Sequence, residues 1–293
     1  MVKILIKVFS ILITSASYMT IEQQVAQHYG QKNLGAHILA ALMQAGKDIA
    51  RLNIDDLAEI DEFHLGWRAQ TAQLGKDLQL SNTDHVVDIG CGIGGPARYF
   101  ASQYGCRVTG FDLTPAFIDA ARMLTLKCRL GERIVFEVGS ALAMPFASGG
   151  FDAACLIHVG MNIADKSTLF AEAKRVLRPG GRFAIYDVML MDDVPLAYPM
   201  PWSSGPLTSF VAGPATYRQL LEKAGFVLEA EYNRRDDVLA AIAARRARMA
   251  LEAPPILGLH VIMGPEAKPR LQNVLSALEQ GNIAPIEMIL RAA

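Results

Sequence analysis

This chain of 293 residues has few cysteines and almost no net charge. Its four cysteines show no C-x-x-C spacing, which argues against a disulfide framework or a zinc site, and no metal is expected. The formal net charge of −1 gives no basic face for nucleic acid and no charge-driven attachment to membranes. The sequence therefore favours a globular enzyme with reduced thiols, working in the cytoplasm on a small molecule.

The apolar run at the N-terminus is short and interrupted. It extends from Val2 to Ile13, contains Lys3 and Lys7, and falls below the roughly 20 apolar residues that a membrane-spanning helix needs, so stable membrane insertion is not expected. Residues 1–20 resemble a weak signal peptide or an extension upstream of Met19. The extension is favoured, because the cysteine pattern fits the cytosol.

Strand and helix patterns alternate through most of the chain. Apolar residues at helical spacing cover residues 21 to about 79, and repeated strand–helix units follow. This order predicts an α/β fold with a doubly wound, mostly parallel, seven-stranded sheet of Rossmann-like type. The expected strands are Val86–Ile89, Arg107–Phe111, Ile134–Val138, Asp152–Ile157, Arg182–Val188, Phe226–Tyr232 and Ala284–Leu290.

Three segments fall outside these units. Residues 21–80 are expected to form a helical cap before the main domain at 81–293. Residues 189–214 are rich in proline and aromatic side chains, and such a long loop predicts a functional lid. Residues 236–280 are expected to form a helical insert before the last strand, with the basic run 245–248 interpreted as a solvated helix face rather than a partner site.

The most informative stretch is HVVDIGCGIGGPARYF, residues 85–100, which is typical of a buried strand, a glycine turn and a helix. Gly90, Gly92 and Gly95 match the G-x-G-x-x-G of dinucleotide-binding proteins, so the spacing alone leaves two ligand classes open. Asp88 lies two residues before the turn, and its negative charge suits a positively charged ligand better than a pyrophosphate. Cys91 within the turn is interpreted as small rather than reactive.

A second acidic residue is placed for ribose binding. Asp112 ends the second expected strand, 24 positions after Asp88, where nucleotide-binding sheets hold both ribose hydroxyls. Its alternative role, capping the helix that begins near Pro115, is weaker because Thr114 is the better cap.

With these motifs in place, the chain resembles a class I S-adenosylmethionine-dependent methyltransferase over residues 61–226. The resemblance rests on VVDIGCGIGG at 86–95, GFDL at 110–113, GSALAMPF at 139–146 and RVLRPGG at 175–181. Within the class, FHLG at 63–66 and HVGMNIADK at 158–166 are similar to the branch with sarcosine/dimethylglycine and tocopherol methyltransferases.

The resemblance implies S-adenosylmethionine as cofactor. In it Asp112 binds the ribose hydroxyls and Leu113 flanks the adenine. Ser140 stands where the family usually has an aspartate for the adenine amino group, and its hydroxyl is a weaker acceptor. The backbone of Ala141 would also meet the adenine ring. The methionine end would be held by Asp88, Gly90, Cys91, Gly92 and Gly95.

The acceptor is expected to be an amine, a phenol or a quinol. Methyl transfer is an in-line displacement, so alignment and exclusion of water supply much of the rate. His158, after the fourth strand, is the candidate base, although it could instead orient its loop or bind the cofactor carboxylate. The other expected substrate contacts are His64 as part of a lid or as a structural histidine, Asn162, and the aromatic side chains of Tyr198 and Trp202.

Two other functions remain open from the sequence. The glycine spacing permits a nicotinamide-dependent oxidoreductase, although Asp88 and the RPGG motif do not favour it. The serine at position 140 also permits a scaffold that binds the cofactor without catalysis. Homo-oligomerisation is possible.

Overall fold

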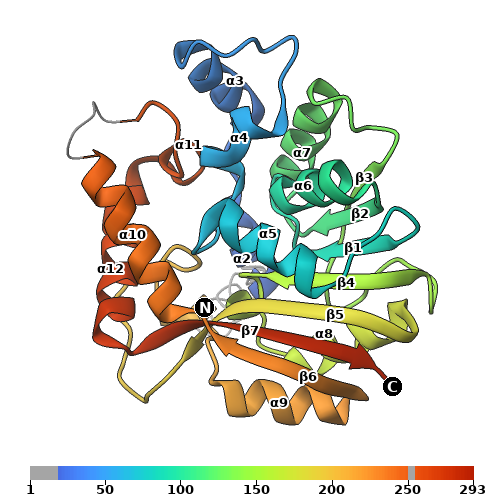
Figure 1. The fold of residues 1–293 in the computed structure, drawn as a ribbon. Coiled ribbons are helices and arrows are strands. Elements are labelled where there is room, and N and C mark those ends of the chain that lie inside the picture. Colours follow the sequence, from blue (N-terminus) through green and yellow to red (C-terminus); the bar gives the residue numbers. More distant parts are fainter. Residues whose placement is uncertain (1–18, 250–254) are drawn as a thin grey trace, which may run out of the picture.

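The computed structural model describes residues 19–249 and 255–293 (Figure 1). The predicted N-terminal extension lies outside these residues, apart from its last two positions. Among the described helices, none is long and apolar enough to cross a lipid bilayer.

A seven-stranded sheet with the order β3-β2-β1-β4-β5-β7-β6 forms the centre of the molecule. The pairs from β3 to β5 are parallel, and β7 is antiparallel to both β5 and β6. The predicted doubly wound, mostly parallel sheet is confirmed. Its strands are β1 (His85–Ile89), β2 (Arg107–Asp112), β3 (Ile134–Val138), β4 (Phe151–Ile157), β5 (Leu177–Leu190), β6 (Phe226–Asn233) and β7 (Ile283–Ala292).

The strand order reverses between β1 and β4. From β1 the chain moves outward through β2 and β3, then returns to place β4 on the other side of β1. At such a switch point the connections after neighbouring strands diverge and leave a crevice at their carboxyl ends, where α/β proteins bind ligands.

Strand β5 is longer than the sequence predicts. It begins at Leu177 rather than Arg182, with a shift of register against β4 between Phe151 and Ala153. It ends at Leu190, because its pairing with β7 continues as far as Ile283. The expected loop at 189–214 therefore starts two residues later.

The N-terminal segment is divided into four helices rather than one continuous pattern. They are α2 (Ile21–Tyr29), α3 (Leu34–Gln44), α4 (Ile54–Asp61) and α5 (Trp67–Asp77). Capping boxes at Thr20 and Asn53 fix the starts of α2 and α4. Helix α3 packs on α7 (Pro115–Lys127), whereas α4 and α5 pack on α6 (Gly95–Tyr104), as Figure 1 shows.

The segment expected as a helical insert is also divided, into α10 (Arg235–Met249), α11 (His260–Met263) and α12 (Ala267–Gln280). Gly264, with φ +66°, and Pro265 end α11 and prevent a continuous helix. The short 3-10 turn η3 (Gly264–Glu266) leads directly into α12. In Figure 1 α10 and α12 lie side by side next to the start of β7, and both contact that strand.

Apolar clusters cover both faces of the sheet and extend into the added segments. On one face α8 (Lys166–Val176) and α9 (Pro214–Lys223) pack on the strands, and on the other α5, α6 and α7 do so. A third cluster joins α3, α4 and α7 to Leu257 and Ile262, and a fourth joins α10 and α12 to Met161 and Trp202. The N-terminal helices and the segment before β7 therefore meet over the carboxyl ends of the strands.

Candidate functional site

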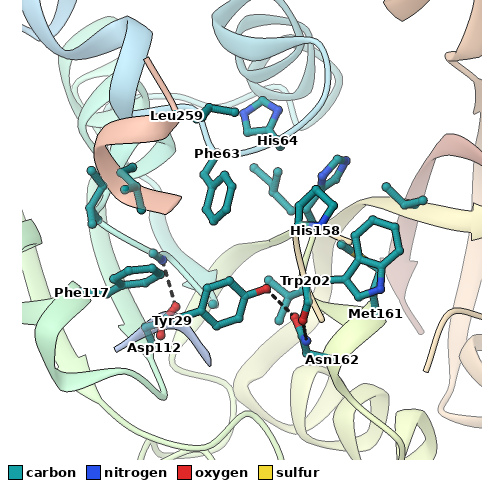
Figure 2. Close-up of a pocket in the computed structure, with 18 of the residues that line it drawn as sticks. Tyr29, Phe63, His64, Asp112, Phe117, His158, Met161, Asn162, Trp202 and Leu259 are labelled. Carbon is teal, nitrogen blue, oxygen red and sulfur yellow. Dashed lines mark hydrogen bonds between the residues drawn. The ribbon is translucent and has the colours of Figure 1, made fainter. Parts of the chain in front are cut away.

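A cavity of about 700 Å³ lies at the carboxyl ends of β1, β2 and β4. We call this cavity the chamber. Its walls come from the sheet edge, from α2 and the loop after α4, from the 3-10 turn η1 (Gly160–Asn162), and from α10 to α12. Figure 2 shows part of its lining.

The glycine turn after β1 borders the chamber with its backbone. Gly90 has φ +73°, and a Cβ there would lie 2.4 Å from the side chain of Val159, so only glycine fits. Gly92 has φ +53° with open space beside it, and its N–H donates to Asp112. Gly95 does not line the chamber: a Cβ there would lie 2.0 Å from the carbonyl oxygen of Asp61, so this glycine permits close packing of α6 on α4.

Asp88 brings an unpaired carboxylate to the chamber wall. The side chain is buried in β1, with Oδ1 3.3 Å from the Cys155 Sγ, and Oδ2 has no hydrogen-bond partner among the described residues. Burial raises the pKa of Asp88 to about 7, with the hydrogen bond from Cys155 acting against it. A cationic group beside Asp88 would therefore be stabilised.

Asp112 stands at the end of β2, as predicted, and uses both carboxylate oxygens to hold the neighbouring loops. Oδ2 accepts from the Gly92 N–H at 3.0 Å and Oδ1 from the Thr114 N–H at 2.8 Å. Burial raises its pKa, and these two backbone bonds counteract the shift. Thr114 occupies the N-cap position, but its side chain makes no capping hydrogen bond, so the expectation that it is the better cap was wrong.

His158 follows β4 and presents a neutral imidazole at the wall. Its ring stacks on Tyr186, with centroids 5.2 Å apart and planes 22° apart, and its backbone has φ +54°. Nε2 is buried and has no hydrogen-bond partner among the described residues. Burial, and then the charge of His64, hold the pKa of His158 well below 6.5. The ring is therefore unprotonated at neutral pH.

His64 lies edge-on to His158, with ring centroids 5.9 Å apart. It sits in the loop between α4 and α5, not in a helix as the sequence suggested. Its Nδ1 is 3.1 Å from the Leu65 carbonyl oxygen and its Nε2 is 3.0 Å from Glu62 Oε2, so both ring nitrogens face acceptors. The ring is therefore held from both sides.

Glu62 is the buried counter-ion of this histidine, and no sequence motif indicated it. Burial alone would raise its pKa, but the hydrogen bond from His64 and the charges of His64 and Arg68 lower it. Thr71 also donates to this carboxylate at 2.6 Å. Glu62 therefore fixes the position of His64.

Helix α2 closes the chamber from the N-terminal side, a role that no sequence motif indicated. The Tyr29 hydroxyl donates to Asn162 Oδ1 at 2.8 Å, while the Asn162 amide donates to the Trp202 carbonyl at 2.7 Å. In Figure 2 Tyr29 lies between Asp112 and Asn162. Two turns earlier in α2, the carboxylate of Glu22 accepts a hydrogen bond from the Ser140 hydroxyl.

Asp187 holds the loop that carries His158. Its buried carboxylate accepts from the backbone N–H groups of Val159 and Gly160, each at 3.0 Å, and from the Tyr217 hydroxyl at 2.7 Å. Burial raises its pKa to about 7, and the bond from Tyr217 opposes the shift. The conformation of this loop is therefore set from β5.

The wall opposite the glycine turn is largely apolar. Trp202 is 2% exposed and donates through Nε1 to Ser209 at 2.9 Å. Tyr198 does not line the chamber; it packs in the cluster of α10 and α12. The apolar lining on this side includes Trp67, Met161, Val188, Trp202, Ile242, Val274 and Leu275.

The basic run on α10 departs from the expected solvated face at Arg245 alone. Arg245 is 23% exposed, lines the chamber, stacks 5.2 Å over the ring of Trp67 and pairs with Glu59. Arg246 and Arg248 are exposed as expected, although Arg246 also borders the chamber and pairs with Glu279 at 3.0 Å.

The structure brings most of the expected site residues to one place. Gly95, Ser140 and Tyr198 are the three that do not line the chamber. Their roles, and those of the others, stay predictions. The expected residues that do line it are His64, Asp88, Gly90, Cys91, Gly92, Asp112, Leu113, Ala141, His158, Asn162 and Trp202.

Comparison with known proteins identifies the central part of the chain. Residues 87–185 match the family model described as a methyltransferase domain. The chain is 32% identical over 179 residues to the methyltransferase GfsG of Streptomyces halstedii, covering 60% of this chain and 62% of that protein. It is 39% identical over 100 residues to a probable chloroplastic tocopherol O-methyltransferase of Oryza sativa subsp. japonica, covering 34% of this chain and 28% of that protein.

The chain thus spans less than two thirds of the length of these relatives. Among solved structures, a putative sarcosine dimethylglycine methyltransferase from Galdieria sulphuraria has the same fold, with a TM-score of 0.60 and 19% identity. That likeness covers 89% of this chain and 99% of the other. Residues 87–185 therefore match a methyltransferase domain, and the predicted resemblance of the chain to the class I S-adenosylmethionine-dependent methyltransferases is confirmed.

Proposed function

We propose that the protein transfers a methyl group from S-adenosylmethionine to a small-molecule acceptor bound in the chamber. The observation that carries this proposal is the buried Oδ2 of Asp88, which lies beside the glycine turn without a hydrogen-bond partner among the described residues. A carboxylate in that position attracts a cation and repels a pyrophosphate. It therefore favours a positively charged cofactor over a nicotinamide dinucleotide.

The residues along the sheet edge fit such a cofactor. Asp88 would meet the ammonium of the methionine end, and the backbone of Gly90 and Gly92 allows close approach there. Asp112 retains lone pairs for ribose hydroxyls, because each of its oxygens accepts only one bond from the protein. Leu113 and Phe117 supply apolar surface for the base at this end of the chamber.

S-adenosylmethionine supplies an electrophilic methyl group when bound. The protein excludes water and aligns the acceptor, which together can provide most of the acceleration. The neutral ring of His158 is suited to accept a hydrogen bond or a proton from an acceptor hydroxyl. Burial, and then the neighbouring His64 held by Glu62, lower the pKa of His158 and keep that ring available as an acceptor.

We propose that the acceptor is a neutral or anionic molecule with a large apolar part, such as a phenol or a quinol, rather than a small cationic amine. The wall formed by Met161, Trp202 and Val274 offers apolar surface, and Arg245 and Arg246 are cations. Of the amine, phenol and quinol classes predicted from the sequence, the two hydroxyl classes fit this wall better.

The cytoplasm is the proposed location. All four cysteines are free, and three of them are buried, as expected of structural thiols in a reducing compartment.

Calorimetric titration with S-adenosylhomocysteine and with NAD tests the cofactor. We expect saturable binding of the former alone, and binding of NAD alone would overturn the proposal. Release of S-adenosylhomocysteine from S-adenosylmethionine, measured across phenols, quinols and amines, tests catalysis. Tight cofactor binding with no turnover on any acceptor would instead support a scaffold.

A further inference from the structure

A smaller recess of about 30 Å³ adjoins the chamber. We call it the Arg270 recess. It shares part of its wall with the chamber, and the shared residues are Tyr29, Phe63, Pro201 and Ile262. The remaining lining residues are His28, Gln31, Met263 and Arg270. Only one layer of side chains therefore separates a molecule in the chamber from the Arg270 recess.

Arg270 is a buried cation that makes no ion pair. Its side chain belongs to α12, the residue is 9% exposed, and none of the ion pairs among residues 19–249 and 255–293 includes it. Nη1 donates to the Met200 carbonyl at 3.2 Å, and Nη2 donates to the Ser204 hydroxyl at 3.0 Å. Nε is buried without a hydrogen-bond partner among the described residues.

His28 next to it is neutral. Its Nε2 lies 2.6 Å from Nη1 of Arg270 and 3.0 Å from the Pro201 carbonyl oxygen, and the unprotonated nitrogen accepts from the guanidinium. Burial lowers the pKa of His28, and the charge of Arg270 lowers it further, whereas the nearby Pro201 carbonyl raises it. The guanidinium is therefore hydrogen-bonded only to neutral groups, and the Glu266 carboxylate, four residues earlier, acts on it through space without forming an ion pair.

Such an arrangement is costly unless a negative charge completes it. Buried charges in proteins are normally paired, and a buried donor without a partner costs about 1–3 kcal/mol. Gln31 in the wall of the recess is also suited to an anion, because its amide donates to the Ile262 carbonyl through one hydrogen and keeps a second N–H. A volume of about 30 Å³ exceeds the roughly 10–15 Å³ that one water molecule needs, and leaves room for a small group such as a carboxylate.

We propose that the Arg270 recess binds a carboxylate-sized oxyanion of the methyl acceptor. This inference rests on the proposed function, and it defines the acceptor as an apolar molecule with an acidic group at one end. The apolar part would lie in the chamber against Trp67 and Trp202, and the oxyanion would meet Arg270.

The two tryptophans provide the readout. They are the only tryptophans in the chain, and both line the chamber, so a bound apolar ligand changes their fluorescence. We would titrate the protein with decanoate and with decanamide, which share an apolar tail and differ in charge. The wild-type protein should bind decanoate at least about tenfold more tightly, as expected for charge-assisted hydrogen bonds.

Three variants test whether Arg270 causes the preference for decanoate over decanamide. Arg270→Met should reduce the ratio of the two affinities to about one, because it keeps the length of the side chain and removes its charge. Arg270→Lys should retain part of the ratio. Lys268→Met, which removes an exposed cation of the same helix that lines neither cavity, should leave the ratio unchanged. A ratio that survives in Arg270→Met, or one that disappears in Lys268→Met, would overturn the proposal.

Titration with acetate and with inorganic phosphate tests whether the Arg270 recess binds free ions or only an oxyanion that is part of a larger acceptor. Neither should protect the protein against thermal unfolding at the concentrations at which decanoate does. Equal, Arg270-dependent protection by either one would overturn the assignment to the acceptor. Equal affinities for decanoate and decanamide in the wild-type protein would overturn it without any variant, and so independently of whether Arg270→Met folds.

Binding of S-adenosylhomocysteine distinguishes this inference from the proposed function. If the cofactor binds and the preference for decanoate is missing, only the inference fails. If the cofactor does not bind, the proposed function fails whatever the fatty-acid titrations show.

Discussion

The hydroxyl of Ser140 donates a hydrogen bond to the carboxylate of Glu22, although the two residues lie 118 positions apart in the sequence. Ser140 occupies the position at which the resembled family usually has an aspartate. Helix α2 therefore brings a carboxylate to the position at which the resemblance implies one. Glu22 itself lines the chamber.

Replacing Glu22 by glutamine should weaken binding of S-adenosylhomocysteine by about 0.5–1.5 kcal/mol, the usual contribution of a single hydrogen bond. Calorimetric titration measures the change. Ser140→Asp in the Glu22→Gln background should restore affinity, because a carboxylate then stands at position 140. The interpretation is wrong if Glu22→Gln binds as tightly as the wild type.

Asp112→Ala should weaken binding of S-adenosylhomocysteine by roughly 1.5–3 kcal/mol, as expected for charge-assisted hydrogen bonds to hydroxyls. Asp112→Asn is the matched variant, since its amide oxygen can still accept from Gly92 or Thr114 and hold one of the two loops. It should fold as stably as the wild type and still bind the cofactor weakly. Unchanged affinity in both variants would refute the ribose assignment.

His158→Asn should reduce turnover by about 10²–10⁴-fold without changing cofactor affinity, if the imidazole acts as the base. Asparagine is the suitable replacement because it tolerates φ +54° better than most residues. A single-turnover assay with the best acceptor from the screen measures the loss. Full activity in His158→Asn would leave the ring only a role in orienting its loop.

Asp88→Asn should increase stability by an amount that grows with pH. The pKa of Asp88 is raised to about 7, so ionisation of the folded protein at this site is unfavourable, and the associated cost appears as pH rises from about 4 to about 7. The gain of the variant should reach about 2–4 kcal/mol above pH 7.

Urea unfolding of both proteins at pH 5 and pH 8 measures this gain. The same variant should bind S-adenosylhomocysteine more weakly, because it can no longer pair with an ammonium. An equal difference in stability at the two pH values would contradict the assigned shift.

Arg98→Met should destabilise the protein by about 3–5 kcal/mol, because it leaves the buried carboxylate of Asp61 with only the longer contact to Arg68, at 3.6 Å. The guanidinium of Arg98 and the carboxylate of Asp61 are both fully buried, with Nη2 3.1 Å from Oδ2. The double variant with Asp61→Asn should recover much of the loss in urea unfolding. Additive losses in the double variant would show that the pair does not couple α4 to α6.

Much of the fold follows from local sequence patterns. The parallel strands were predicted within a few residues, because buried strands appear as short apolar runs and glycines mark the turns between them. The prediction for the N-terminal segment was less accurate. Its helical spacing continues across the loop that holds His64, and burial of Glu62 beneath that loop depends on contacts that periodicity does not report.

The site residues likewise fall into those that the sequence predicted and those that only tertiary packing placed there. Asp88, Asp112 and His158 lie at the carboxyl ends of strands that are neighbours in the sheet, and their convergence follows from the rule that parallel strands end at one edge. Glu22, Tyr29 and Arg270 come from helices whose position over that edge depends on packing between distant segments. No spacing of residues in the sequence could indicate where these helices lie over the sheet.

The sequence by itself determined the sheet, the glycine turn and the family to which the chain is related, because each depends on residues close together in the chain. Tertiary structure alone decided what surrounds the acceptor. Helices α2, α10 and α12 meet over the strand ends and place Arg270 in a recess without a carboxylate partner among the described residues, since buried contacts between remote segments are set by packing.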